Sequence, residues 1–211
     1  MRFRILALAI ALLFVLPLGG RCMELDLTTP APPRAVPQLS SGALLDAPPM
    51  KLDCAAAMLL EAESGQILFE FNADSQRAVA SVTKLMTILL TLEAIDSGRL
   101  ALEQQVVISK EAAGMGGSQV LLDVGETQSV SLLLKSMIVG SANDAAVALA
   151  EALYGSEALC CAKMNERAQE LGMADTHFVN CTGLPVDGQH TTVRDVARMS
   201  IAVFGHSLYY A

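Results

Sequence analysis

A serine and a lysine stand three residues apart, at Ser81 and Lys84, where an apolar helix is expected to begin. A serine hydroxyl is a weak nucleophile that needs an adjacent base, and a lysine amine can be that base when burial lowers its pKa. Most residues of the run 82–95 are apolar, which predicts a buried helix. At 100° per residue, Lys84, Thr87 and Thr91 share one narrow polar seam of that helix. The pair is therefore a candidate nucleophile and base.

The same two residues also fit a structural role, with Ser81 as a helix cap and Lys84 extending along the surface. Two observations favour a catalytic role for this pair. Of the five lysines, Lys84 alone has a serine three residues earlier. A second polar motif, with Ser141 and Asn143, lies between two predicted apolar helices, where packing does not explain it, although either residue could cap a helix.

With these motifs the sequence resembles the penicillin-binding D-alanyl-D-alanine carboxypeptidases of low molecular mass, which share the serine acyl-transferase fold of β-lactamases. The resemblance covers about residues 52–204 and rests on residues 80–87 (ASVTKLMT), 141–146 (SANDAA) and 178–184 (FVNCTGL). It implies an α+β fold of the β-lactamase/transpeptidase type, with an antiparallel sheet and a helical subdomain.

The resemblance also implies roles for four residues. Ser81 would be the acylated nucleophile, Lys84 the proton acceptor and Ser141 a hydroxyl that relays protons to the leaving amine. Asn143 would fix the substrate amide and Lys84. The expected reaction removes the terminal D-alanine from peptidoglycan stem peptides, and β-lactam antibiotics would act as inhibitors.

The third motif of these relatives is missing. They carry Lys-Thr-Gly or Lys-Ser-Gly on an edge strand near the C-terminal end of the fold, and this sequence has no such tripeptide. Cys181, Thr182 and Gly183 come too early and include no cation, so we expect a turn before Pro185. By the same resemblance, one of the two backbone N–H donors of the oxyanion hole would be absent together with this strand. Loss of one such donor typically costs about 10² to 10³ in rate. We therefore expect a truncated fragment that lacks its C-terminal strands and has little activity, with peripheral membrane association through the missing C-terminal segment as a further possibility.

Two alternative functions stay open. A β-lactamase of the same fold needs an extra glutamate placed after the second motif to hydrolyse its acyl-enzyme quickly. Glu166 is predicted to lie on a regular helix, so no such loop is expected there. The other alternative is a non-catalytic cell-wall-binding fragment.

The N-terminal region predicts export. Arg2 and Arg4 precede an apolar run over residues 5–18, which is typical of a secretory signal peptide, here residues 1–22. An uncleaved anchor and lipidation at Cys22 are the alternatives. A Pro-rich linker over residues 23–51 and the carboxypeptidase-like domain over residues 52–211 follow. The expected location is extracellular or periplasmic, at the outer face of the cytoplasmic membrane.

Within the domain, residues 55–61 and 66–72 predict a β-hairpin and residues 105–109 a short strand, while the glycine-rich residues 114–118 predict a surface loop. Further helices are expected over residues 130–139, 145–154, 157–171 and 192–204. Ser156 and Thr192 are the predicted caps of the last two, and Gly172 is the predicted end of the third.

Composition excludes some partners. The net charge of −8 argues against a nucleic-acid surface, because phosphate binding needs clustered Lys and Arg. The three histidines, His177, His190 and His206, form no ligand pattern, so we expect neither a metal nor another cofactor. Export would permit disulfides, with three full pairings among four cysteines: Cys54, Cys160, Cys161 and Cys181. Cys160 and Cys161 are adjacent on a predicted helix, which favours their interpretation as small buried apolar residues.

Overall fold

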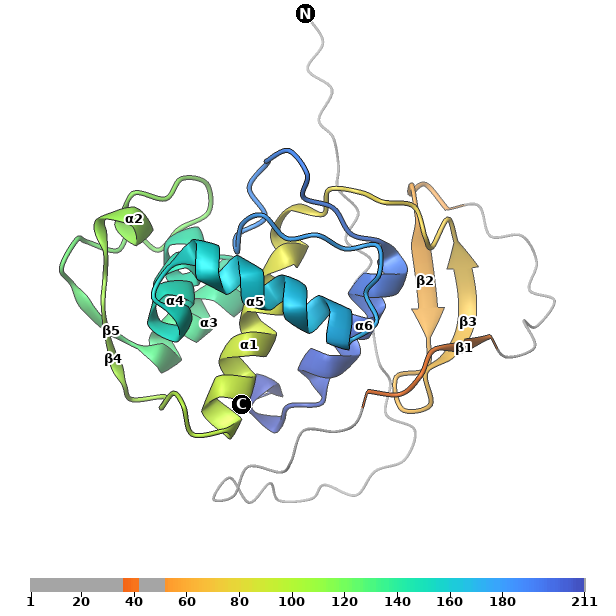
Figure 1. Ribbon diagram of the computed structural model, residues 1–211, viewed down its shortest axis with the longest axis horizontal. Coiled ribbons are helices and arrows are strands. Elements are labelled where there is room, and N and C mark those ends of the chain that lie inside the picture. Colours follow the sequence, from red (N-terminus) through yellow and green to blue (C-terminus); the bar gives the residue numbers. More distant parts are fainter. Residues whose placement is uncertain (1–35, 42–51, 211) are drawn as a thin grey trace, which may run out of the picture.

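The computed structural model describes residues 36–41 and 52–210. A small sheet lies at one end of the molecule, a two-stranded ribbon with a short helix lies at the other, and the longer helices fill the space between them (Figure 1). The predicted signal peptide and most of the predicted linker lie outside the described residues.

The sheet has the order β1-β3-β2. Strands β2 (Ala57–Leu60) and β3 (Gln66–Phe71) pair antiparallel, so the predicted hairpin is confirmed. The turn is closed by Glu61, whose carboxylate accepts hydrogen bonds from the N–H groups of Glu63 and Ser64. Strand β1 (Ser40–Ser41) pairs parallel to β3, an element that the sequence did not predict within the Pro-rich segment.

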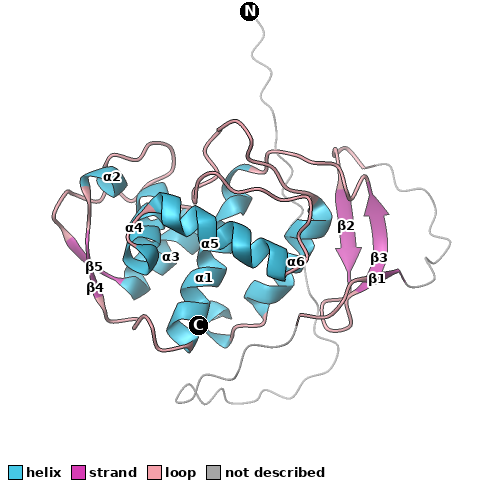
Figure 2. Ribbon diagram, in the orientation of Figure 1, coloured by secondary structure: helices cyan, strands magenta, loops and turns pink. Residues whose placement is uncertain are grey.

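The longer helices form one core around α1 (Lys84–Asp96), which contacts α3 (Val130–Gly140), α4 (Asn143–Tyr154), α5 (Glu157–Glu170) and α6 (Val193–Phe204) (Figure 2). Helix α4 is buried over its first eight residues, from Asn143 to Ala150. Helix α6 contacts both α1 and β2 and so connects the sheet to the core.

Two predicted helix starts are confirmed at their caps. The Ser156 hydroxyl accepts a hydrogen bond from Leu159 N–H at 3.2 Å, and the Thr192 hydroxyl accepts one from Asp195 N–H at 3.1 Å. Gly172, with a φ of 72°, follows α5 as predicted.

Two of the short elements were not predicted. Strand β4 (Gln105–Val107) was expected, but its antiparallel partner β5 (Thr127–Ser129) and the short helix α2 (Lys110–Ala113) were not. Such short segments carry too few residues to show a period. A 3₁₀ turn, η1 (Ala80–Thr83), precedes α1, and a second, η2 (Ser207–Tyr210), follows α6.

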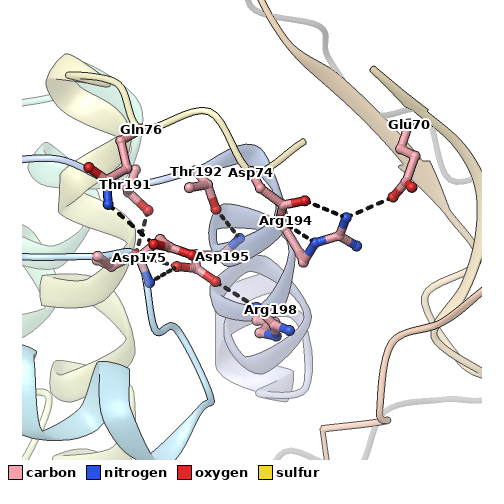
Figure 3. Close-up of polar contacts among 10 residues, drawn as sticks. Glu70, Asp74, Gln76, Asp175, Thr191, Thr192, Arg194, Asp195 and Arg198 are labelled. Carbon is pink, nitrogen blue, oxygen red and sulfur yellow. Dashed lines mark hydrogen bonds and ion pairs between the residues drawn. The ribbon is translucent and has the colours of Figure 1, made fainter. Parts of the chain in front are cut away.

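A polar network joins the sheet to the start of α6 (Figure 3). The Arg194 guanidinium binds the Asp74 carboxylate through Nε at 2.6 Å and through Nη2 at 3.0 Å, and Nη2 also lies 2.9 Å from the Glu70 carboxylate. We call these three residues the Arg194 network. Beside it, Asp195 accepts hydrogen bonds from Asp175 N–H and from the Thr176 hydroxyl.

Among the described residues, no single helix is long and apolar enough to cross a membrane, and α4 and α5 meet that test only as a pair, by length and composition, with a bend of 81° between them.

Candidate active site

The predicted nucleophile and base are in contact. Lys84 Nζ lies 3.1 Å from Ser81 Oγ, and it also donates a hydrogen bond to the carbonyl oxygen of Thr182 at 2.8 Å. Ser81 is exposed, whereas the Lys84 side chain is buried, with 2% of its surface accessible. An accessible hydroxyl therefore touches an amine that is shielded from water.

Burial lowers the pKa of Lys84, because desolvation penalises the ammonium form. The amine is held by a hydroxyl and a carbonyl, and neither carries a negative charge that would restore the ammonium. The rest of the predicted polar seam is also buried and satisfied, since the Thr87 hydroxyl donates to Cys181 O at 2.9 Å and the Thr91 hydroxyl to Thr87 O at 2.8 Å.

Ser81 is not a helix cap, which removes the structural interpretation of its position. It lies inside η1, and neither η1 nor α1 begins with a side-chain cap. The first N–H groups of a helix carry partial positive charge, so an uncapped start favours negative charge that develops beside Ser81.

The backbone at the nucleophile is tightly packed and strained. Ala80 has a φ of 47°, a conformation that costs a residue other than glycine about 1–3 kcal/mol. Gly183, with a φ of 85°, lies against it so closely that a Cβ would stand 1.9 Å from Ala80 O. Position 183 therefore requires glycine.

The second motif holds the neighbouring loop. Ser141, with a φ of 54°, ends α3, and Asn143 begins α4. Asn143 Nδ2 donates to Gly116 O at 2.7 Å, and its backbone N–H donates to Ser118 O at 2.7 Å. In the part of the chain that is described, no hydrogen bond joins Ser141 or Asn143 to Ser81 or Lys84.

The D-alanyl-D-alanine carboxypeptidase family matches residues 44–209 of the sequence. The chain belongs to this family.

Individual relatives support the same family membership. The chain is 43% identical over 145 residues to D-alanyl-D-alanine carboxypeptidase DacF of Bacillus subtilis, an alignment that covers 69% of this chain and 37% of DacF. Penicillin binding protein 6B from Escherichia coli superposes with a TM-score of 0.76 and 33% identity, over 82% of this chain and 57% of that one. Penicillin-Binding Protein D2 from Listeria monocytogenes in its ampicillin-bound form gives a TM-score of 0.66 and 34% identity, over 75% and 64%.

These neighbours confirm the β-lactamase/transpeptidase-like α+β fold that the resemblance implied. The chain spans less than two thirds of the length of each of these relatives.

Three residues at or beside the candidate site were missed or underestimated from the sequence. Thr182 and Gly183 were expected to form only a turn, yet the Thr182 carbonyl holds Lys84 and Gly183 packs on Ala80. A backbone acceptor leaves no mark in the residue type, so only the quoted run 178–184 pointed to them. The third is Asp144, whose fully buried carboxylate accepts hydrogen bonds from the N–H groups of Val120 and Leu122.

The described cysteines are free thiols: Cys54, Cys160, Cys161 and Cys181. The last three are buried, which for Cys160 and Cys161 agrees with their interpretation as small apolar residues. Burial raises the pKa of Cys160 and of Cys161 to about 12 and that of Cys181 further, so all three are uncharged at neutral pH.

Two further expectations concern acidic and metal-binding residues. Glu166 lies within α5, as predicted, and its carboxylate pairs with Lys163 at 2.6 Å. Within residues 36–41 and 52–210, no three His, Cys, Asp or Glu side chains gather as a metal site would require.

Proposed function

We propose that this chain carries the acylating part of a serine-type D-Ala-D-Ala carboxypeptidase site that trims the terminal D-alanine from peptidoglycan stem peptides. The observation that carries the proposal is the contact between a buried lysine amine and an exposed serine hydroxyl, Lys84 Nζ and Ser81 Oγ, at 3.1 Å. Membership of the carboxypeptidase family supports the choice of substrate.

In the proposed reaction, Ser81 Oγ attacks the carbonyl carbon of the penultimate D-alanine while neutral Lys84 takes the hydroxyl proton. The C–N bond then breaks, and that proton passes through the Ser141 hydroxyl to the amine of the departing D-alanine. The shortened peptide stays on Ser81 as an ester. Water then hydrolyses the ester, which releases the peptide and restores the hydroxyl. Asn143 is proposed to fix the substrate amide.

The same attack on a β-lactam ring would open its amide bond and leave the drug on Ser81. A relative solved in an ampicillin-bound form supports this part of the proposal. Rapid hydrolysis of that adduct, as in a β-lactamase, needs a positioned glutamate, and Glu166 is instead paired with Lys163 on a regular helix. We therefore propose that penicillin is trapped rather than turned over.

The proposed substrate lies outside the cytoplasmic membrane. The predicted signal peptide over residues 1–22 supports export to that side, and peripheral attachment to the membrane is part of the same proposal.

The test is covalent labelling of the protein expressed from its whole gene. Fluorescent penicillin is expected to label the wild type and the control Ser200→Ala, whose hydroxyl only bonds Val196 O within α6. Ser81→Ala is expected to lose the label. Labelling that persists in Ser81→Ala would overturn the assignment of the nucleophile. Release of D-alanine from a stem peptide tests the substrate, and a folded protein that binds peptidoglycan without labelling or releasing D-alanine would favour the non-catalytic alternative.

A further inference from the structure

The peptide unit between Thr182 and Gly183 is bound on both sides. Its carbonyl oxygen accepts a hydrogen bond from Lys84 Nζ at 2.8 Å, and its N–H donates one to Asn180 Oδ1, also at 2.8 Å. The C=O and N–H of a trans peptide point in opposite directions. A partner that holds the N–H therefore sets the direction of the carbonyl, and here that partner is Asn180.

The Asn180 side chain is itself fixed in one orientation. Its Nδ2 donates to Leu184 O at 2.9 Å, while its Oδ1 also lies 3.3 Å from the Thr182 N–H. Gln189 holds it from the other side, because Gln189 Oε1 accepts from the Asn180 backbone N–H at 2.9 Å and Gln189 Nε2 donates to Asn180 Oδ1 at 3.3 Å. These partners assign the amide oxygen and nitrogen of Asn180 without ambiguity.

Such a hold is needed because this peptide precedes a glycine. Glycine adopts positive and negative φ with similar ease, so the peptide before it can turn over through one ψ and one φ. A reversed Thr182–Gly183 peptide would present an N–H, in place of an acceptor, to the Lys84 amine. No side chain can stiffen position 183, since a Cβ would meet Ala80 O.

We propose that Asn180 is a positioning residue of the acyl-transfer site, which keeps the Thr182 carbonyl directed at Lys84 and so holds Nζ against Ser81 Oγ. Asn180 makes no hydrogen bond to Ser81 or Lys84 in the described structure; it acts through the peptide. Its effect on catalysis rests on the proposed function, whereas its effect on the Lys84 amine does not.

The titratable groups near Lys84 determine how a substitution at position 180 would change the pKa of its amine. The Cys181 thiol is close by and uncharged, since burial raises its pKa. Glu157, from α5, accepts a hydrogen bond from Cys181 N–H at 3.0 Å, and the Asp144 carboxylate, from α4, is occupied by backbone N–H groups. A charge introduced at position 180 would therefore act on the amine through a short, partly buried path.

Two substitutions give opposite expected results. Asn180→Ala frees the peptide, so we expect penicillin acylation at neutral pH to fall about 10- to 100-fold, and the midpoint of the acylation–pH profile to move down as the ammonium loses its carbonyl acceptor. Asn180→Asp keeps the shape and the acceptor for Gly183 N–H, loses the donor to Leu184 O and adds a negative charge, so the midpoint is expected to move up.

Asn165→Ala is the matched control. Asn165 binds the same loop, with Nδ2 donating to Phe178 O and Oδ1 accepting from Phe178 N–H, both at 2.8 Å, but it does not touch the peptide that faces Lys84. It is expected to lower the melting temperature and leave the midpoint in place. Equal midpoints in Asn180→Ala and Asn165→Ala, or shifts of the same sign in the alanine and aspartate variants, would overturn the proposal. If Asn180→Ala does not fold, Asn180→Asp tests the proposal by itself, because an unchanged midpoint in that variant would contradict the proposal.

A second measurement separates this inference from the proposed function. The Cε resonance of carbon-13-labelled Lys84, assigned by its loss in Lys84→Met, reports protonation of the amine without any substrate. Opposite shifts of its titration in Asn180→Ala and Asn180→Asp would support the positioning role even in a protein that fails to react with penicillin. An unchanged titration in both would refute it, whatever the labelling shows.

Discussion

Lys84 and Arg194 occupy similar places and are held in different ways. Each lies in the first turn of a helix, α1 or α6, where the helix dipole disfavours a cation. Arg194 is compensated by the carboxylates of Asp74 and Glu70, which raise its pKa. Among residues 36–41 and 52–210, Lys84 has a carbonyl and a hydroxyl as its hydrogen-bond partners, and burial lowers its pKa.

The difference separates a structural cation from a reactive one. The Arg194 guanidinium is always charged, and its carboxylate partners use that charge to join β3 to α6 (Figure 3). Neutral partners hold the Lys84 amine in place but supply no negative charge that would offset the burial of its ammonium form. A lysine held in this way can take up and return a proton during acyl transfer.

The largest expected effect is that of Lys84→Met, which removes the base and keeps the volume. Acylation by fluorescent penicillin is expected to fall about 10² to 10⁴-fold, because general base catalysis typically contributes that much. The free energy of unfolding is expected to stay equal or rise, since a desolvated amine is replaced by an apolar side chain.

Arg194→Met is the paired variant for that experiment. It is expected to lose about 1 kcal/mol of stability in urea unfolding, because its ion pairs are partly exposed, and to acylate normally. If Lys84→Met were the less stable variant, or Arg194→Met the less reactive one, the contrast between the two cations would fail.

Gly183→Ala is expected to damage both the fold and the site. The added Cβ would lie 1.9 Å from Ala80 O at a φ of 85°, which should lower the free energy of unfolding by about 2–4 kcal/mol and move the carbonyl that holds Lys84. Gly98→Ala is the control, because Gly98 has a φ of 70° and a Cβ there would meet no other group within 4 Å, so it should cost only about 1 kcal/mol. Similar losses in unfolding experiments would show that the close approach to Ala80 is unimportant.

The two cations should affect opposite ends of the pH range. Acylation is expected to rise with pH through the lowered pKa of Lys84, because only the neutral amine accepts the proton. The unfolded state keeps its proton up to about pH 10.4, so between the two pKa values it binds more protons than the folded state, and stability from this group rises with pH there. Lys84→Met should show neither change.

At the acid end, the hydrogen bond from Arg194 lowers the pKa of Asp74. This contribution to stability is present above the ordinary carboxyl range, near pH 4, and is lost as the pH falls through the folded-state pKa. Urea midpoints measured from pH 2 to 6 should therefore converge for the wild type and Arg194→Met at the lowest pH. A constant difference would contradict the pairing.

Removal of a helix cap is expected to have the smallest effect on the site. Thr192 caps the helix that carries Arg194, so Thr192→Ala should cost about 1 kcal/mol in urea unfolding. Acylation should not change, because α1 begins without a side-chain cap and does not depend on this one. A slower acylation at equal stability would show that the two helix starts are coupled.

Local patterns in the sequence were enough to predict the hairpin, the long helices and the caps at Ser156 and Thr192, because each depends on residues within a few positions. The contact between Ser81 and Lys84 was predictable for the same reason, since the two residues are one turn apart. Strand β1 was not, because its pairing with β3 depends on contacts across an intervening segment that carries no period.

The partner of the lysine was beyond sequence reasoning for a different reason. Any residue could supply the carbonyl that Thr182 offers, and 98 positions separate it from Lys84. Asp144 gave a weaker signal, because an acidic residue in an apolar helix suggests a buried acceptor without naming the N–H groups of Val120 and Leu122. The contact between the Ser81 and Lys84 side chains could therefore be predicted, whereas the backbone that holds Lys84 could not.

The distance in sequence between Lys84 and Thr182 also fixes when the site can form. A ribosome makes the Ser81 helix long before it makes the loop that closes over it, and at about 5–20 residues per second the interval is at least several seconds. During that time the lysine lacks the carbonyl that holds it and remains open to water, where its amine stays protonated. The contact that holds the Lys84 amine can therefore form only after Thr182 has been synthesised, so the proposed base is completed later than the proposed nucleophile.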